Sequence, residues 1–316
     1  MTTVERASTQ DQRSSSFPLV VLGLVIVSWG AGPVITKLIT THPVIGVVIR
    51  FALSVPLLLG LLRLRGQRLD RAVLRQTALP GVAFGINLIF VFFALQEATV
   101  AVLSVSIALQ PALLLLIVGP LFGERPTMAH VGWTLLGVVG AAGVILGAGD
   151  ELRASPLGLL YAGAALVTFS TYFVLTRLAR STSDVDPVRW MAGINLWSLL
   201  AALVPTPFLV GRDELAEVDL ADLGWLVVLA YVTGVFGHVL MSWVHGYIEA
   251  ARSALYLLAM NLVAVGLAWP IHDEPVTIRQ ALAGLVVLGS VAMVIRLPPR
   301  PTTDQDLSDD AGVAAA

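Results

Sequence analysis

The sequence predicts an all-α integral membrane protein with ten transmembrane helices, arranged as two inverted five-helix repeats. Three observations support this fold class. Of the 316 residues, 57% are hydrophobic and 13% are charged, so the chain has more apolar surface than a water-soluble fold can bury. Uncharged stretches of about 20 residues, enough to cross a hydrocarbon core roughly 30 Å thick, recur along the whole chain. The two halves of the sequence also align with each other, and their equivalent loops differ in charge.

Each helix is placed by its span length and by the charges, prolines and glycines that bound it. The polar segment 1–16 is expected to be a disordered cytoplasmic N-terminus, followed by a first helix at 17–38 that is retained in the mature chain. The other nine helices are expected at 43–62, 77–96, 100–119, 128–148, 156–176, 188–208, 223–245, 253–270 and 277–296. Short connections make consecutive helices antiparallel neighbours. The polar tail 298–316 is expected to be disordered and cytoplasmic.

An internal repeat relates the two halves. The segment QPALLLLIVGPLFGERPT (110–127) aligns with MNLVAVGLAWPIHDEPVT (260–277), so that Glu124 falls on Glu274. Because each repeat contains five helices, an odd number, the second repeat enters the membrane from the opposite side. The two repeats are expected at 17–148 and 156–297.

Two equivalent loops predict the orientation of the chain. The stretch RLRGQRLDRAVLR (63–75) carries five arginines, whereas its counterpart GRDELAEVDLAD (211–222) carries one arginine and five acids. The positive-inside rule places the first loop in the cytoplasm, and inversion places the second outside. We therefore expect a multi-pass protein of the cytoplasmic membrane with both termini cytoplasmic. Contact with anionic lipid is a second interpretation of the arginines.

Polar residues inside the spans are the candidate site, because charge within a membrane is costly. Arg50 lies about seven residues, or roughly 10 Å, into the second helix. We expect a midplane substrate site from Trp29, Arg50, Asn87, Gln110, His238 and Asn261. Arg50 would bind a carboxylate of the substrate. The alternatives are that the amides only bridge helices and that His238 and Trp29 only pack.

Three residues are candidates for gating or ion coupling. Lys37 and Glu97 lie at the outer ends of their helices, and His238 lies in mid-span. We expect Arg50 to pair with Glu97 when the site is empty, and proton coupling, if present, to use Glu97 or His238. The alternatives are snorkelling for Lys37 and an interfacial acid facing water for Glu97.

Two further features predict packing. Glu124 and Glu274 lie in tight turns before helices and are expected to cap helix starts. Gly143 and Gly147 form a GxxxG pattern, which predicts close helix contact either within the bundle or between protomers.

The composition also excludes several kinds of chemistry. The absence of cysteine removes disulfides, thiol nucleophiles and thiolate metal sites, and the five histidines are scattered. We therefore expect no catalytic residues, no cofactor, no metal and no nucleic-acid partner. The expected partners are a small-molecule substrate and membrane lipids, and a homo-oligomer is left open.

Four segments resemble a known family: SWGAGPVITK, HPVIGVVIRF, ALQEATVAVLSVSIALQP and GERPT with the following GVVGAAGVIL. They are similar to the EamA repeat of the drug/metabolite transporter superfamily, and the likeness covers about residues 18–297. The resemblance implies a ten-helix carrier that exports small metabolites by alternating access without ATP. The chain departs from the family at Glu97, where a tyrosine is usual and the second repeat keeps Tyr247. The helix-4 proline is kept as Pro111, but its counterpart is Asn261.

The function expected from these observations is a secondary transporter, not an enzyme, that exports amino acids or amphipathic or anionic compounds across the cytoplasmic membrane. One alternative is a membrane-embedded enzyme acting on a lipid-linked substrate, which would need clustered acids, histidines or a metal set at the interface. Another is a non-transporting scaffold or sensor, which would lack a water-accessible central cavity.

Overall fold

The fold is helical, as the apolar composition predicts. The computed structural model describes residues 17–110, 112, 114, 124–146, 154–180, 185–216, 218–244, 247, 256–297 and 300–301. Within these residues, eight segments are long and apolar enough to cross a membrane, by length and composition. The expected fourth helix lies partly outside the described residues, and the expected ninth is a 14-residue helix. The all-helical class is confirmed, while the count of ten spans stays a prediction.

The chain divides into two compact units, which are described separately. The first unit comprises Met1–Ser104 and Arg153–Pro275, and the second comprises Val105–Leu152 and Val276–Ala316. Each unit therefore takes segments from both sequence repeats.

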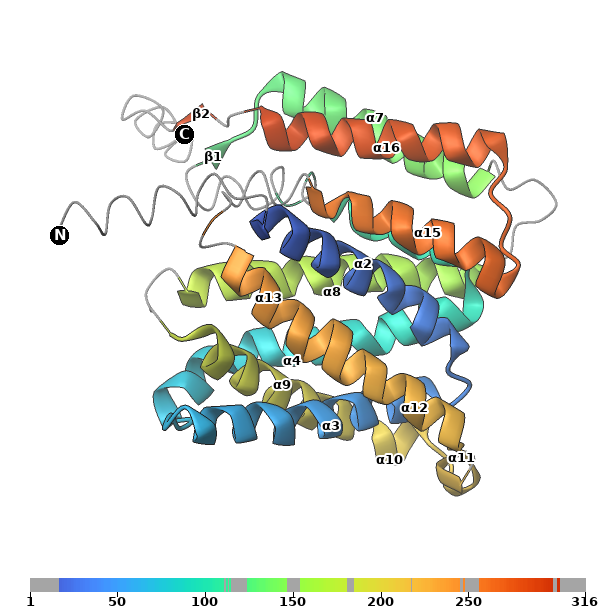
Figure 1. The fold of residues 1–316 in the computed structure, drawn as a ribbon. Helices are drawn as coiled ribbons and strands as arrows, with labels where there is room; N and C mark the ends of the chain where they lie inside the picture. The colour runs from blue at the N-terminus through green and yellow to red at the C-terminus, as the bar shows by residue number, and fades with distance from the viewer. Residues whose placement is uncertain are drawn as a thin grey trace, which may run out of the picture. The chain divides into compact units, whose positions relative to one another are not determined.

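Most of the helices belong to the first unit (Figure 1). They are α2 (Phe17–Leu38), α3 (Pro43–Leu64), α4 (Arg71–Glu97), the start of α5 (Val100–Ala108), α8 (Pro156–Arg180), α9 (Pro187–Leu203), α10 (Thr206–Leu209), α11 (Arg212–Ala216), α12 (Leu220–Val228), the π-helix η3 (Leu229–Phe236), α13 (Gly237–Val244) and α15 (Ala259–His272). Helix α2 has the bounds expected for the first span. Segments α12, η3 and α13 follow one another without a break, where the sequence predicts one helix at 223–245.

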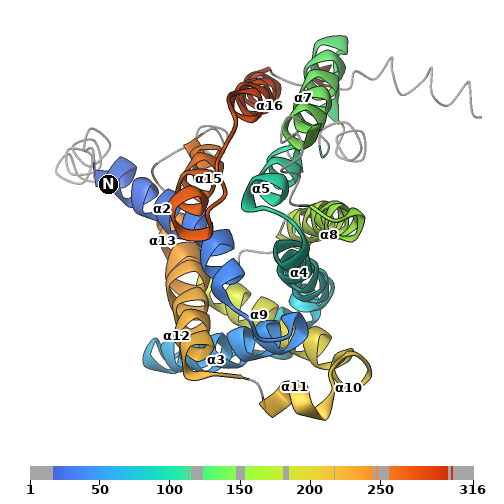
Figure 2. The same cartoon turned by 90° about the vertical axis from the view of Figure 1, so that its right-hand side faces the viewer.

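Close packing in the first unit depends on small residues. Helix α4 packs against α8 and α9, and α2 packs against α15 (Figures 1 and 2). A Cβ atom on Gly81 would lie 2.6 Å from the Cβ of Trp197 in α9. A Cβ atom on Gly30 would lie 2.7 Å from the backbone oxygen of Met260 in α15. Since a real Cβ cannot approach so closely, these glycines set the distances between the helix axes.

Helix α4 begins six residues before its predicted start at 77, because Asp70 caps it. The Val73 N–H donates to Asp70 Oδ1 at 2.9 Å, which satisfies one of the free amides of the first turn. Arg71 and Arg75 therefore lie on the helix and not in a loop. The arginine run thus spans the end of α3 and the start of α4.

The second unit contains α7 (Met128–Leu146), α16 (Ile278–Arg296) and a two-residue strand pair, β1 (Glu124–Arg125) with β2 (Arg300–Pro301). Helices α7 and α16 lie side by side (Figure 1). A Cβ atom on Gly140 would lie 2.9 Å from Val287 Cγ2, and one on Gly143 would lie 3.0 Å from Ala283 Cβ. The glycine contact is therefore internal to this unit; Gly147 lies outside the described residues.

Both ends of α16 differ from the expectations of the sequence. Thr277 caps its start through a capping box with Gln280, in which each side chain accepts a backbone N–H at 3.1 Å. The helix that follows Glu274 is therefore capped by Thr277 and not by Glu274. Beyond its end, β2 lies within the tail expected to be disordered, so these two residues differ from that expectation.

Candidate functional site

Four of the expected site residues from the first unit, Trp29, Arg50, His238 and Lys37, fall into two groups. One group, the arginine cluster, consists of Trp29, Arg50, Phe84, Thr233 and His238. The other, the lysine clasp, consists of Lys37, Ala98, Val100 and Glu274.

The arginine cluster is centred on Thr233 of η3. Arg50 Nη2 lies 3.5 Å from Thr233 Oγ1, a long hydrogen bond that the guanidinium donates. The Trp29 Nε1–H donates to the backbone oxygen of Thr233 at 3.0 Å. The Trp29 and His238 rings lie 5.0 Å apart between centroids, and the Phe84 and His238 rings 6.4 Å apart. Three residues predicted from separate helices, Trp29, Arg50 and His238, are thus brought together.

Within the cluster, Phe84 of α4 packs against aromatic rings of α3 and α8. The Phe84 ring lies 4.8 Å from Tyr172 and 5.9 Å from Phe51, between centroids. These three supporting rings are buried, whereas Trp29, Arg50 and His238 each keep some exposed surface. The residues that carry the polar groups are therefore less buried than the aromatic rings beside them.

Arg50 has no carboxylate partner among the described residues. The pairing of Arg50 with Glu97 that we expected for an empty site is absent from this conformation. Glu97 is exposed at the last turn of α4, where its Oε2 accepts a hydrogen bond from Ser155 Oγ at 2.7 Å. Ser155 in turn accepts the Gly158 N–H at the start of α8. Glu97 thus belongs to the α4–α8 boundary, whereas Arg50 lies about two turns inside α3.

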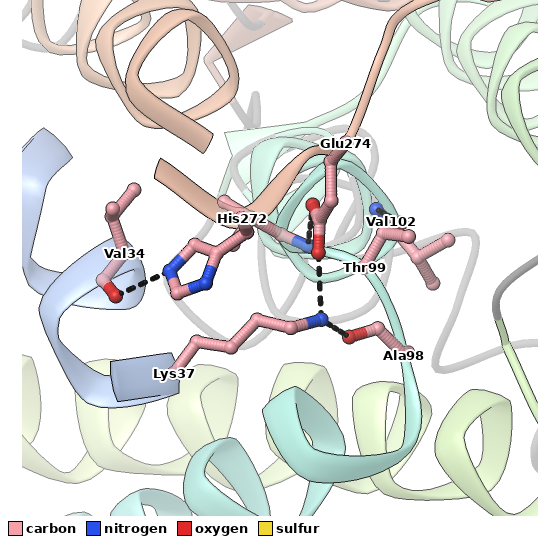
Figure 3. A network of polar contacts seen from close by, with 8 residues as sticks. Val34, Lys37, Ala98, Thr99, Val102, His272 and Glu274 are labelled. Atoms are coloured by element: carbon pink, nitrogen blue, oxygen red, sulfur yellow. Dashed lines mark hydrogen bonds and ion pairs between the residues drawn. The ribbon is translucent and has the colours of Figure 1, made fainter. Parts of the chain in front are cut away.

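The lysine clasp joins three segments that are distant in sequence (Figure 3). Lys37 Nζ, at the end of α2, lies 2.6 Å from Glu274 Oε1 and donates to the Ala98 oxygen at 2.6 Å. Glu274 Oε2 accepts the Val100 N–H at 2.9 Å. Lys37 and Glu274 therefore form an ion pair. The side chains are 22% and 7% exposed, and such burial makes the separation of the two charges costly.

A second contact strengthens the same end of α2. A ring nitrogen of His272, in the last turn of α15, lies 2.8 Å from the Val34 oxygen (Figure 3). The end of α2 is therefore tied both to α15 and to the connection between α15 and α16.

Sequence reasoning missed the role of Glu274. Its expected function as a helix cap is partly correct, because it accepts the Val100 N–H at the start of α5 rather than at the helix that follows it. It also neutralises Lys37, whose ammonium lies in the clasp instead of snorkelling outward as in the alternative interpretation. The available signal was a carboxylate at the equivalent turn of each repeat.

None of the hydrogen bonds described for the three expected amide residues joins them to the arginine cluster. Asn87 Nδ2 donates to Ala165 O at 2.8 Å and to Thr168 Oγ1 at 3.3 Å, so it bridges α4 and α8. Asn261 Nδ2 lies 3.4 Å from the Leu258 oxygen in the adjacent turn. Gln110 belongs to the second unit, where its Nε2 is buried without a partner among the described residues.

The fold and the apolar spans define a multi-pass helical membrane protein. The EamA-like transporter family matches the sequence twice, over residues 17–146 and 156–296, so the chain belongs to that family. It is similar to an uncharacterized transporter of Archaeoglobus fulgidus, with 26% identity over 285 residues that cover 88% of this chain and 98% of the relative. A crystal structure of a protein with 22% identity has a TM-score of 0.61 and covers 90% of this chain and 98% of its own, which supports the fold.

Proposed function

We propose that this protein is a secondary transporter that exports small metabolites with a negatively charged group across the cytoplasmic membrane by alternating access. The observation that carries the proposal is Arg50, a charged residue within a span that has no acid partner among the described residues. Because an unneutralised charge in a membrane is costly, a substrate anion is its natural counter-charge. The planar guanidinium suits a carboxylate or phosphate through two parallel hydrogen bonds.

The rest of the proposed site is built from the first unit. The rings of Trp29 and His238 offer flat surfaces to an apolar part of the substrate. Asn87 and Asn261 act as secondary polar contacts when their amides reorient. Gln110 belongs to the other unit, and its role in substrate binding stays a prediction from the sequence.

The lysine clasp is the proposed gate. Alternating access requires one end of the bundle to open, and the clasp ties α2, the α4–α5 connection and the α15–α16 connection together. Opening there separates Lys37 from Glu274. By the topology predicted from the arginine run, this end faces outward.

A transport assay in proteoliposomes tests the function. Purified protein is offered radiolabelled carboxylates and phosphates, each paired with an uncharged analogue. We expect at least one anion to be transported, with its analogue excluded, and Arg50→Ala to abolish the transport. Arg75→Ala removes the same charge from an exposed position of α4 and serves as the matched control. Equal transport of charged and uncharged compounds, or full activity of Arg50→Ala, would contradict the proposal.

The orientation of the chain has its own test. We propose that both termini and residues 63–75 are cytoplasmic and that residues 211–222 are external, since these equivalent segments differ in charge. Reporter fusions after residues 68 and 216 are expected to report opposite sides. The same side for both would overturn the inverted arrangement.

A further inference from the structure

The π-helix η3 anchors side chains from a neighbouring helix. Ser28 Oγ donates to the Val232 oxygen at 3.2 Å, and Trp29 Nε1 donates to the Thr233 oxygen at 3.0 Å. Both donors come from α2. A π-helical turn within an α-helical run is uncommon and occurs frequently at functional sites. Segment η3, between α12 and α13 (Figure 1), is such a turn.

Helix α3 contacts the same turn. Ser54 Oγ lies 3.4 Å from the Ala230 oxygen and also donates to the Arg50 oxygen one turn earlier at 2.9 Å. Arg50 itself donates to the Thr233 hydroxyl. Helices α2 and α3 therefore both contact η3 through polar atoms, and Thr233 is the residue that they share.

The Thr233 hydroxyl has a fixed direction. It donates its proton to the Leu229 oxygen at 2.7 Å, so its lone pairs are left to accept from Arg50. Thr233 is 5% exposed, and water therefore cannot readily replace these contacts. One residue thus holds the guanidinium of Arg50 with its side chain and the indole of Trp29 with its backbone.

The position of Trp29 is restricted further by the next turn. A Cβ atom on Gly237 would collide with the Trp29 ring, which shows how closely the indole approaches α13. On that helix the indole also contacts the His238 ring. The orientation of the ring is therefore determined by η3 and α13.

We infer that Thr233 is a positioning residue that fixes the spacing between Arg50 and Trp29, and thereby selects substrates by the distance between an anionic and an apolar group. This inference rests on the proposed function. Buried Thr77, by comparison, bonds only to its own helix in the contacts described: its Oγ1 donates to the Val73 and Leu74 oxygens. Thr233 differs because its hydroxyl also meets a guanidinium from another helix.

The first arm of the test needs no ligand. Phenylglyoxal modifies accessible arginines, and mass spectrometry of the peptide that contains Arg50 gives the rate at this position in the full-length purified protein. Thr233→Val keeps the shape and removes the hydroxyl. We expect it to raise the rate of Arg50 modification about threefold to tenfold, the effect of losing one hydrogen bond.

Three variants make that arm specific. Thr233→Ser retains the hydroxyl and is expected to react like the wild type. Thr77→Val, the matched control, removes a buried hydroxyl that bonds only to its own helix and is expected to leave the rate unchanged. If Thr233→Val does not fold, Thr233→Ala removes the same hydroxyl without introducing a new methyl position. An unchanged rate in the folded variant that lacks the hydroxyl, or the same increase in Thr77→Val, would overturn the inference.

The second arm uses benzoate as an anionic probe and benzamide as its uncharged counterpart. Benzoate is expected to protect Arg50 of the wild type from phenylglyoxal, and benzamide is not. In Thr233→Val, protection is expected to need about tenfold more benzoate. Equal protection in the variant would contradict the positioning role in binding. Failure of benzoate to protect the wild type would count against the anion site of the proposed function, while the first arm still decides whether Thr233 positions Arg50.

Discussion

Arg50 and Lys37 are two cations of the same unit with opposite electrostatic surroundings. Lys37 has the Glu274 carboxylate 2.6 Å away and the Ala98 carbonyl oxygen at the same distance. Arg50 has the Thr233 hydroxyl at 3.5 Å, and no described residue supplies it with an acid. The charge of Lys37 is therefore neutralised within the structure, and the charge of Arg50 is not.

This difference separates a structural tie from a binding group. A buried pair adds little net stability, but removing one partner leaves an uncompensated charge, so the pair resists separation. A cation without an internal partner gains most from an external anion. On this basis we propose that Lys37 holds one end of the bundle together and that Arg50 binds substrate.

The largest expected effect comes from breaking the clasp. Glu274→Gln leaves Lys37 as an unpaired buried cation, and Lys37→Met leaves the carboxylate alone. Each is expected to lower the free energy of unfolding by about 3–5 kcal/mol. Removing both charges together is expected to recover most of that loss, because neither charge is left unpaired. Denaturant unfolding of the two single variants and the double variant measures the free energy of unfolding. If the two single losses simply add in the double variant, Lys37 and Glu274 do not act as an ion pair.

Replacing Arg50 is expected to affect binding more than stability. Arg50→Ala removes a charge-assisted contact, and we expect the transported anion to bind roughly 10–100-fold more weakly. Arg50→Lys keeps the charge but loses the planar fork, so it is expected to bind nearly as poorly. Equilibrium binding with folded, membrane-inserted variants is the measurement. Wild-type affinity in both variants would make Arg50 a structural residue.

A transport cycle driven by protons requires a group that gains and loses a proton, and Glu97 and His238 are the candidates in the same unit. If transport depends on a proton gradient, the double variant Glu97→Gln with His238→Gln is expected to lower the gradient-driven rate about fivefold or more. Histidine and carboxylate groups are the available proton carriers among the expected coupling residues. The pH profile of transport in proteoliposomes measures this. A profile identical to that of the wild type would exclude both residues from coupling.

The smallest effect is expected at an exposed pair, Asp70 with Arg189. The Val73 N–H and the Arg189 guanidinium lower the pKa of Asp70 below its ordinary value. The lowered pKa means that the folded state favours the charged form of Asp70. The stabilisation from this charge is fully present above the unfolded carboxyl pKa of about 3.9, and it is lost as the pH falls through the pKa of the folded state.

Asp70→Asn keeps a capping side chain and removes the charge. We expect a small decrease in melting temperature at pH 7 and none at acid pH, where the aspartate is already protonated. A loss of stability at pH 7 as large as that caused by Glu274→Gln would contradict the distinction between exposed and buried ion pairs.

Local properties of the sequence determined the helices. The span predicted at 17–38 has the same bounds as α2, because hydrophobicity and flanking polar residues act within one segment. The predicted start of α4 at residue 77 is too late, because span length depends on hydrophobicity and does not include the cap that Asp70 provides. Arg50 was also recognisable as a candidate, since its depth in an apolar segment is a property of that segment alone.

Only the tertiary structure decided which groups neutralise one another. Lys37 and Glu274 lie in different repeats, and no local pattern in either segment specifies that they meet. Thr233 is unremarkable in sequence, and its role follows from the π-helical turn that presents it to α2 and α3. Hydrophobicity accumulates along the chain and predicts spans, whereas an ion pair or a shared hydrogen bond depends on the relative position of helices distant in sequence. The sequence therefore determined where charges lie along the helices. Packing decided that Glu274 neutralises Lys37, whereas Arg50 contacts a hydroxyl and no acid among the described residues.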